Sequence, residues 1–310
     1  MSKLLVILGA TGQQGGSIIS YILNNPLLSK EYSLRGISRD ASSPRAQALK
    51  LKGVEIFEAD INRPDSLKNA FRDANIVFGQ TNTIYENNSK ERELMQGKAI
   101  VDAAVAAGVQ YFIWSTSTNV TKITEGKLKQ VIHFDVKAEI EEYIRALPIK
   151  SAFYAPGSFM QNLHSVMTPH PVGDGTYAIS NIYEPETKIP WIDIANDTGK
   201  FIAPILTDPT KYEGKILSAA IKLYSLEEVA ITLSNATGKV VNYRKVSEEF
   251  LRPFLPPSFA NELIEMFLYI RDYGYYGPLT KEDVEWSSQQ AQGKLITIEE
   301  YLAIDPLDLN

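Results

Sequence analysis

The amino-acid sequence predicts an α/β fold in which a doubly wound parallel sheet carries a smaller C-terminal α+β lobe. Three observations lead to this prediction. Short apolar runs alternate with helical patterns through the first half of the chain, which is typical of βαβ units. A glycine-rich turn at residues 9–16 follows the first apolar run and opens a helical pattern, as in Rossmann-type folds. With 310 residues, the chain also exceeds the size of about 250–300 residues at which one core stops growing.

Each strand of the predicted sheet is a short apolar run. Residues 4–8 form a continuous aliphatic stretch, as expected of a strand buried on both faces. Further strands are predicted at residues 33–38, 54–59, 75–78, 111–114 and 151–154. By analogy with the fold, the expected strand order is 3-2-1-4-5-6.

Helices are predicted between these strands from the spacing of apolar residues. The helical patterns cover residues 15–23, 90–107 and 134–147. In the longest of them, Leu94, Val101 and Val105 fall on one stripe, which we expect to face the sheet.

The pattern changes after Pro156, where prolines, aromatic residues and turns become more frequent. We expect residues 1–157 to form the Rossmann domain, with returning segments near 190–235 (191–206 and 216–232). Residues 158–189 and 236–310 are expected to form the smaller lobe, which would bind a substrate or a partner and would contain a helix at 259–271.

Composition and charge argue against several classes of protein. The net charge of −6 and the lack of a dense Lys/Arg cluster argue against direct binding to nucleic acid. The absence of cysteine removes disulfides, thiol nucleophiles and Cys-based zinc sites, and His133, His164 and His170 lack metal-ligand spacing. No apolar stretch approaches the length of a membrane span. We therefore expect no metal, no membrane contact and a cytoplasmic location, with the nucleus left open.

The turn at residues 9–16 has the features of a phosphate-binding loop. Gly9 permits the tight turn, Gly12 lets the backbone approach a diphosphate, and Gly15 allows the helix to pack closely on the strand. The free amides and the positive end of the helix dipole would bind the phosphates. We predict that a nicotinamide dinucleotide is held here by Gly9, Thr11, Gly12, Gln13, Gln14, Gly15 and Gly16.

The residues after the second strand favour NADP(H) over NAD(H). NAD-preferring sites place an acid there to bind the ribose 2′-hydroxyl. Here Ser38 and Arg39 stand at that position, and a guanidinium fork can hold a 2′-phosphate while the serine donates a hydrogen bond. Asp40 follows immediately and makes the choice ambiguous, and Arg39 could also be a solvated loop charge.

Two further segments would face the cofactor at the carboxyl edge of the sheet. Asp60 and Ile61 follow the third strand, where an acid and an apolar neighbour could hold the adenine. The alternative role for Asp60 is to cap the helix that begins near Pro64. The fourth strand is followed by Gln80, Thr81, Asn82 and Thr83.

Several segments of the sequence resemble the NmrA-like family of atypical short-chain dehydrogenases. The likeness extends to about residue 165, and the segments that carry it are residues 9–16, 80–82, 96–98 (Gln-Gly-Lys), 133–143 and 156–162. Its most specific part is His-Phe-Asp-Val-Lys at residues 133–137. This stretch looks closer to the HSCARG-type NADPH-sensor branch of the family than to typical dehydrogenases.

The resemblance implies which residues line the cofactor beyond the glycine turn. It places there Arg39, Asp60, Ile61, the residues after the fourth strand, and Lys137. It also implies a loop on the nicotinamide side that contains Pro156, Phe159, Met160 and Asn162. Some members of the family act as redox sensors that bind protein partners, whereas others reduce quinones or enone-like substrates.

The candidate catalytic residues are Lys137 and His133. A typical short-chain dehydrogenase uses Tyr-x-x-x-Lys, and this sequence has His133 in place of the tyrosine, one helical turn before Lys137. Ser115, Thr116 and Ser117 follow the fifth strand, where the family's catalytic serine would lie. A general acid contributes about 10²–10⁴-fold, so loss of the phenol handicaps reduction of an ordinary ketone. A quinone or enone spreads the developing charge and could react with Lys137 alone.

The sequence leaves the function open between a sensor and an enzyme. The protein could be an NADP(H) sensor with weak or no dehydrogenase activity, whose partner would be a protein such as a transcription regulator. It could instead be an NADPH-dependent reductase of quinones or conjugated carbonyls. The alternative without a catalytic role is that His133 is a cap or packing residue and Lys137 is a surface charge. A scaffold that no longer binds the cofactor is the third alternative, and the intact glycine turn argues against it.

Overall fold

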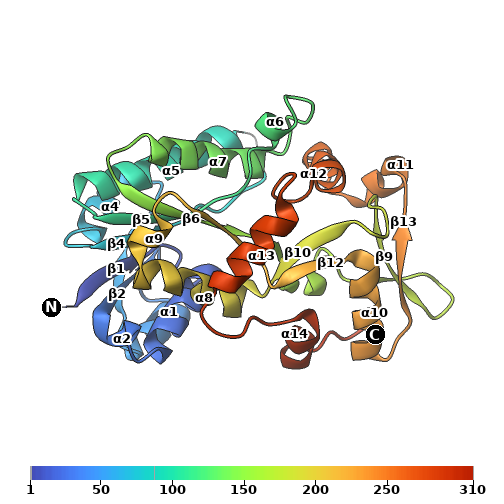
Figure 1. Ribbon diagram of the computed structural model, residues 1–310, viewed down its shortest axis with the longest axis horizontal. Coiled ribbons are helices and arrows are strands. Elements are labelled where there is room, and N and C mark those ends of the chain that lie inside the picture. Colours follow the sequence, from blue (N-terminus) through green and yellow to red (C-terminus); the bar gives the residue numbers. More distant parts are fainter. Residues whose placement is uncertain (1, 87, 310) are drawn as a thin grey trace.

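The computed structural model describes residues 2–86 and 88–309. Its main sheet has seven parallel strands in the order β11-β6-β5-β4-β1-β2-β3 (Figure 1). The strands are β1 (Lys3–Ile7), β2 (Tyr32–Ser38), β3 (Glu55–Glu58), β4 (Ile76–Gly79), β5 (Tyr111–Ser115), β6 (Lys150–Pro156) and β11 (Ile216–Ala219). The predicted order 3-2-1-4-5-6 is confirmed, and β11 extends the sheet beyond β6.

Different helices cover the two faces of this sheet, because successive strand side chains point to opposite faces. Leu5 and Ile7 of β1 belong to one core cluster, and Val6 belongs to another. The first face is covered by α1 (Gln13–Asn24), α2 (Leu28–Glu31), α3 (Pro44–Leu51), α8 (Ile194–Thr207) and α9 (Pro209–Tyr212). The second face is covered by α4 (Pro64–Ala70), α5 (Ser89–Ala106) and α7 (Ile132–Arg145).

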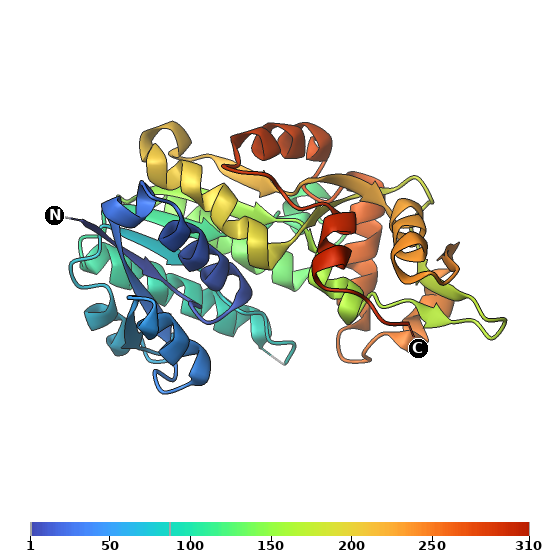
Figure 2. The ribbon, with the colours of Figure 1, turned by 90° about the horizontal axis from the view of Figure 1, so that it is seen from below.

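The first face depends on a close contact between α1 and α8, which lie side by side in Figure 2 in blue and yellow. A Cβ added to Gly199 of α8 would lie 2.7 Å from the backbone oxygen of Ser17. The Gly199 amide also donates a hydrogen bond to Ser17 Oγ at 3.1 Å. Only glycine fits at this contact. The close packing holds α8 against α1 as a helix that covers the main sheet.

The smaller lobe, drawn at the right of Figure 1, contains two three-stranded sheets, β12-β10-β7 and β13-β9-β8. Their strands are β7 (Ser158–Phe159), β8 (His170–Pro171), β9 (Tyr177–Asn181), β10 (Lys188–Ile192), β12 (Lys222–Ser225) and β13 (Val241–Lys245). The segment 191–206, which was expected to return to the main sheet, divides between the lobes: β10 pairs with β7 and β12, whereas α8 packs on the main sheet.

Helices pack around these smaller sheets. They are η1 (Met160–His164), α10 (Leu226–Thr237), α11 (Glu248–Leu251), η2 (Arg252–Phe254), α12 (Ala260–Tyr273) and α14 (Ile298–Ile304). The short α6 (Val120–Ile123) precedes α7, and α13 (Thr280–Gln290) packs beside β11. The helix predicted at 259–271 corresponds to α12.

The buried stripe of α5 differs from the predicted one. Leu94 and Val105 are only half-buried. The buried residues of α5 are Glu93, Gln96, Gly97, Ile100, Val101 and Ala104. The cause is Gly97, which faces α7 so closely that an added Cβ would lie 2.7 Å from Ile140 Cγ1. Close packing at Gly97 buries the acid Glu93 and the amide Gln96. The apolar pattern had predicted that Leu94 would be buried instead.

Candidate functional site

The parallel sheet brings most of the predicted site residues to one edge. Because all seven strands run the same way, their carboxyl ends meet at this edge. Gly9, Arg39, Asp60 and Gln80 follow β1 to β4, and Pro156 ends β6. The edge therefore combines residues that are far apart in the sequence.

The glycine turn has the geometry that its sequence predicts. Gly9 has a φ of +65°, in the left-handed region that favours glycine, and its carbonyl accepts a hydrogen bond from the Gly12 amide at 2.9 Å. A Cβ on Gly15 would lie 2.8 Å from the carbonyl carbon of Gly9. Helix α1 starts at Gln13 without a side-chain cap, so the amides of Gln13, Gln14 and Gly15 have no partner within the helix, whereas the Gly16 amide donates to the Gly12 carbonyl at 2.9 Å.

Two glutamine side chains complete this turn. A Cβ on Gly9 would overlap the amide of Gln80, which lies against the turn and donates to the Leu8 carbonyl at 3.4 Å. Gln14 Oε1 is buried and has no hydrogen-bond partner among the described residues. A buried acceptor without a donor costs about 1–3 kcal/mol. Of the other turn residues, Thr11 is half-buried and Gln13 is exposed.

The segment after β2 leaves one cation available. Ser38 is buried, and its hydroxyl donates to the Asp40 carbonyl at 2.8 Å. The Asp40 carboxylate accepts hydrogen bonds from Ser42, which lower the pKa of Asp40 below its usual value. Arg39 is exposed and makes no hydrogen bond or ion pair with any residue that the structure describes. The acid is therefore engaged locally, whereas the guanidinium is free to meet an anion.

The segment after β3 is held by α5. Asp60 Oδ1 accepts from the Asn62 amide at 2.9 Å, and Gln96 donates to Asn62 Oδ1 at 2.7 Å. Asp60 does not cap the next helix, because α4 begins at Pro64 with Arg63 as its N-cap residue. The capping alternative for Asp60 is therefore wrong.

Lys137 lies beside the loop that follows β4. Its Nζ is 3.3 Å from Thr83 Oγ1 and 3.5 Å from the Thr81 carbonyl, and it forms an ion pair with Glu93. Thr81 Oγ1 donates to the same Glu93 oxygen at 2.6 Å. Sequence reasoning did not find Glu93, since no apolar spacing or motif marks a buried acid on α5. Asn82, between the two threonines, is exposed.

His133 takes part in a different contact, although it shares α7 with Lys137. Its Nδ1 pairs with Glu262 Oε1 of α12, and its backbone amide donates to the same oxygen at 3.0 Å. Tyr85 stands edge-on to the imidazole and stacks on Phe259 at 4.3 Å between ring centroids. Burial, together with the carboxylates of Glu262 and Glu93, raises the pKa of Tyr85 to about 12. These residues form an interlobe clasp, defined as Tyr85, His133, Phe259 and Glu262.

Of the hydroxyl residues at the end of β5, Thr116 is also engaged. Ser115 and Thr116 are buried, and Thr116 Oγ1 donates to Glu141 Oε2 at 2.7 Å. Burial raises the pKa of this Glu141 carboxyl. The Thr116 hydroxyl therefore stabilises an interior acid and does not stand free at the edge of the sheet.

The loop predicted on the nicotinamide side joins the two lobes. Phe159 is half-buried against the main core, whereas Met160 is fully buried in the core of the smaller lobe. Asn162 is half-buried. The residue before it, Gln161, donates a hydrogen bond to Asp193 Oδ1 at 2.8 Å. The same edge of the sheet is reached by Ile61, which packs against the core of the second face.

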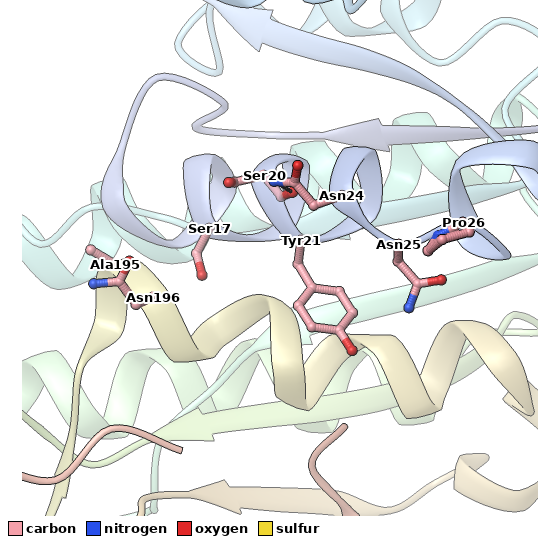
Figure 3. Close-up of a pocket in the computed structure, with 8 residues that line it drawn as sticks. All are labelled: Ser17, Ser20, Tyr21, Asn24, Asn25, Pro26, Ala195 and Asn196. Carbon is pink, nitrogen blue, oxygen red and sulfur yellow. Dashed lines mark hydrogen bonds between the residues drawn. The ribbon is translucent and has the colours of Figure 1, made fainter. Parts of the chain in front are cut away.

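A groove of about 320 Å³ between α1 and α8 lies away from these residues (Figure 3). It is lined by Ser17, Ser20, Tyr21, Asn24, Asn25, Pro26, Ala195 and Asn196. Two of its polar atoms are already used, since Ser17 Oγ accepts from Gly199 and Asn25 Oδ1 accepts from the Leu28 amide. The groove contains none of the predicted site residues and no charged side chain.

Two classes of feature are absent from the part of the chain that the structure describes. No helix there is long and apolar enough to cross a membrane. Within residues 2–86 and 88–309, no group of three or more His, Cys, Asp or Glu side chains could hold a metal ion.

The fold resembles those of NmrA and a triphenylmethane reductase, among other solved structures. NmrA, a negative transcriptional regulator crystallised with NADP, is 22% identical, with a TM-score of 0.80 over 97% of this chain and 94% of that one. The triphenylmethane reductase of Citrobacter sp., crystallised with NADP(H), is 22% identical, with a TM-score of 0.75 over 98% of this chain and 99% of that one. These likenesses establish a shared fold.

Comparison of sequences identifies the family. The NmrA-like family oxidoreductase FrzB of Cladobotryum sp. is 27% identical over 263 residues, which cover 79% of this chain and 77% of FrzB. The model of the NmrA-like family matches residues 1–302. Since this match spans almost the whole sequence, the chain belongs to the NmrA-like family.

Proposed function

We propose that this protein binds NADP(H) on the turn at residues 9–16 and responds to the cofactor as a redox sensor with weak or no dehydrogenase activity. The observation that carries the cofactor assignment is the start of α1. The amides of Gln13, Gln14 and Gly15 lack partners within the helix and can bind a phosphate. NmrA and the triphenylmethane reductase, which share the fold, were crystallised with NADP and NADP(H) respectively.

The cofactor would extend along the carboxyl edge of the sheet. The turn would hold the diphosphate, and Arg39 would meet the 2′-phosphate with its free guanidinium. Asp60 and Ile61 would flank the adenine. Lys137 and the loop after β4 would hold the nicotinamide ribose, with the loop of residues 156–162 beside the ring.

Arg39→Ala tests the preference for NADP(H). We expect the variant to lose about 10- to 100-fold of its preference for NADPH over NADH, because charge-assisted hydrogen bonds contribute about 1.5–3 kcal/mol. Calorimetric Kd values for both nucleotides measure this ratio. Arg45→Ala is the matched control, because Arg45 is an exposed arginine on the neighbouring α3. Equal weakening of both nucleotides in Arg39→Ala would contradict the assignment.

The sensor proposal rests on the path from Lys137 to α12. Thr81 and Thr83, which contact Lys137, share their loop with Tyr85 of the interlobe clasp. Helix α7 carries both Lys137 and His133, and His133 contacts Glu262 of α12. Occupancy of the nicotinamide end would therefore reach the surface of the smaller lobe through two direct connections, where a protein partner could detect it.

The second candidate function is an NADPH-dependent reductase of quinones or conjugated carbonyls. It is favoured by the position of Lys137, whose ammonium can donate a hydrogen bond to an oxygen on which negative charge develops. When bound, NADPH supplies the hydride. His133 lies in the interlobe clasp, where its Nδ1 pairs with Glu262, so Lys137 is the candidate donor for this reaction. FrzB, a relative in the same family, is described as an oxidoreductase.

Hydrogen exchange and turnover separate the two functions. A sensor should show slower exchange in residues 81–86 and in α12 when NADPH binds, and turnover below about 1 s⁻¹ with a panel of quinones and enones. A reductase should exceed that rate with one of them and lose the activity in Lys137→Ala. Unchanged exchange in α12 on NADPH binding would contradict the sensor proposal.

A further inference from the structure

Glu93 is a buried acid to which no role in the site was assigned from the sequence. It is only 3% exposed, and acids are almost never this buried unless they are paired. Its carboxylate contacts Lys137 Nζ and accepts the Thr81 hydroxyl at 2.6 Å. One acid thus connects α5, the candidate lysine of α7 and the loop after β4.

We propose that Glu93 is a positioning residue that holds the Lys137 ammonium at the carboxyl end of β4, ready for the nicotinamide half of a dinucleotide. This inference rests on the proposed function. A lysine ammonium is a point charge on a flexible four-carbon stem, so its place depends on its partners. Thr83 Oγ1 and the Thr81 carbonyl, at 3.3 and 3.5 Å, are distant hydrogen-bond partners, which leaves Glu93 as the main anchor.

The side chains of Lys137 and Glu93 are buried to different extents. The Lys137 side chain is 19% exposed, whereas that of Glu93 is 4% exposed. The lysine side chain is therefore the more accessible of the two. A pair that served only the interior would have no reason to expose its cation.

A second ion pair joins α5 and α7 outside the candidate site. Lys90 of α5 pairs with Glu139 of α7 at 2.6 Å, with side chains 39% and 31% exposed. This surface pair already connects α5 to α7. It also offers a matched control, because Glu139→Gln removes the same charge and breaks a Lys–Glu pair between the same helices.

The first experiment reads the position of Lys137 without any cofactor. The purified protein is treated with formaldehyde and a borane reductant, and methylation of Lys137 is followed by mass spectrometry. We expect Glu93→Gln to speed methylation of Lys137 at least about tenfold, because the amine loses its buried carboxylate. Glu139→Gln should leave this rate unchanged. If Lys137 reacts equally fast in wild type and Glu93→Gln, the proposal is overturned.

The second experiment tests whether Glu93 acts through Lys137. Kd values are measured for NADPH and for 2′,5′-ADP, which lacks the nicotinamide half. We expect Glu93→Gln to reduce the preference for NADPH about tenfold, the scale of the conformational entropy of one lysine side chain. The same substitution in a Lys137→Ala background should not change this preference. An equal loss in both backgrounds would mean a merely structural role and would overturn the proposal.

Two provisions keep the tests decisive. If Glu93→Gln does not fold, Thr81→Val removes the other contact of the carboxylate without changing charge, and a partial gain in Lys137 methylation is expected. Failure of the proposed function gives a different result. Wild type would then bind neither nucleotide, while the methylation experiment would still decide whether Glu93 holds Lys137.

Discussion

The two ends of the candidate cofactor site are built in different ways. The phosphate end is made of backbone: a left-handed Gly9, and a Gly15 so close to Gly9 that no side chain fits between them. The nicotinamide end is made of paired side chains, with Lys137 and Glu93 44 residues apart and His133 and Glu262 129 residues apart. The first is a local structure, whereas the second exists only after the chain has folded.

This difference separates what each end should tolerate. At the phosphate end the limiting quantity is space, so an added methyl group should destabilise the turn. At the nicotinamide end the limiting quantity is the balance of buried charge, so loss of one partner should cost more than loss of both. The predictions below test this contrast, beginning with the largest expected effect.

Lys137→Met should be the most destabilising of these changes. It leaves Glu93, which is 3% exposed, without its countercharge, and breaking such a pair costs about 3–5 kcal/mol. Urea denaturation of the apoprotein measures the free energy of unfolding. The double variant Lys137→Met with Glu93→Gln should recover much of the loss, because no charge is then stranded. A double variant that is less stable than Lys137→Met would show that the charge-balance account of this end is wrong.

Another buried carboxylate tests the charge-balance account away from the candidate site. Asp197 of α8 is fully buried, pairs with Lys200 at 2.7 Å and accepts from the Ile296 amide at 3.1 Å. Burial raises its pKa from 3.8 to about 6. Unlike the partners of Glu93, the partners of Asp197 hold the C-terminal segment to the main sheet layer.

The pH dependence of stability should report Asp197 directly. Because its folded pKa is raised, its contribution is fully present below about 3.8 and is lost as the pH rises through about 6. At 1.36 kcal/mol per pKa unit, wild type should lose about 2–3 kcal/mol relative to Asp197→Asn between pH 4 and pH 8. Chemical denaturation of both proteins across this range measures the difference. A constant difference would mean that Asp197 keeps an ordinary pKa in the folded protein.

The sequence predicted the parts of the molecule that depend on local spacing. The glycine turn and the six strands needed only apolar runs and residues such as Gly9 and Gly15, and the strand order followed by analogy with the Rossmann-type fold. The stripe of α5 was misplaced because its facing side is set by Gly97 against Ile140, a tertiary contact. The roles of the site residues stay predictions.

The residues that sequence reasoning missed share one physical reason. Glu93, Tyr85, Phe259 and Glu262 matter because of what they meet across long separations in the chain. An acid in a helix looks the same in sequence whether it faces solvent or a lysine. Its partner in the folded chain, and not its neighbours in the sequence, decides its role.

The smallest effect, at the phosphate end, is also the most specific test of the contrast. Gly15→Ala would put a Cβ 2.8 Å from the carbonyl carbon of Gly9, and overpacking of this kind costs about 1–3 kcal/mol. Gly16→Ala, one residue further, would put its Cβ 3.7 Å from the Ala10 carbonyl oxygen, an ordinary contact. Since alanine favours a helix by about 0.5–1 kcal/mol over glycine, Gly16→Ala should be neutral or stabilising. Thermal unfolding of the two single-methyl variants compares them, and equal stability would mean that the turn can relax and that space does not limit this end.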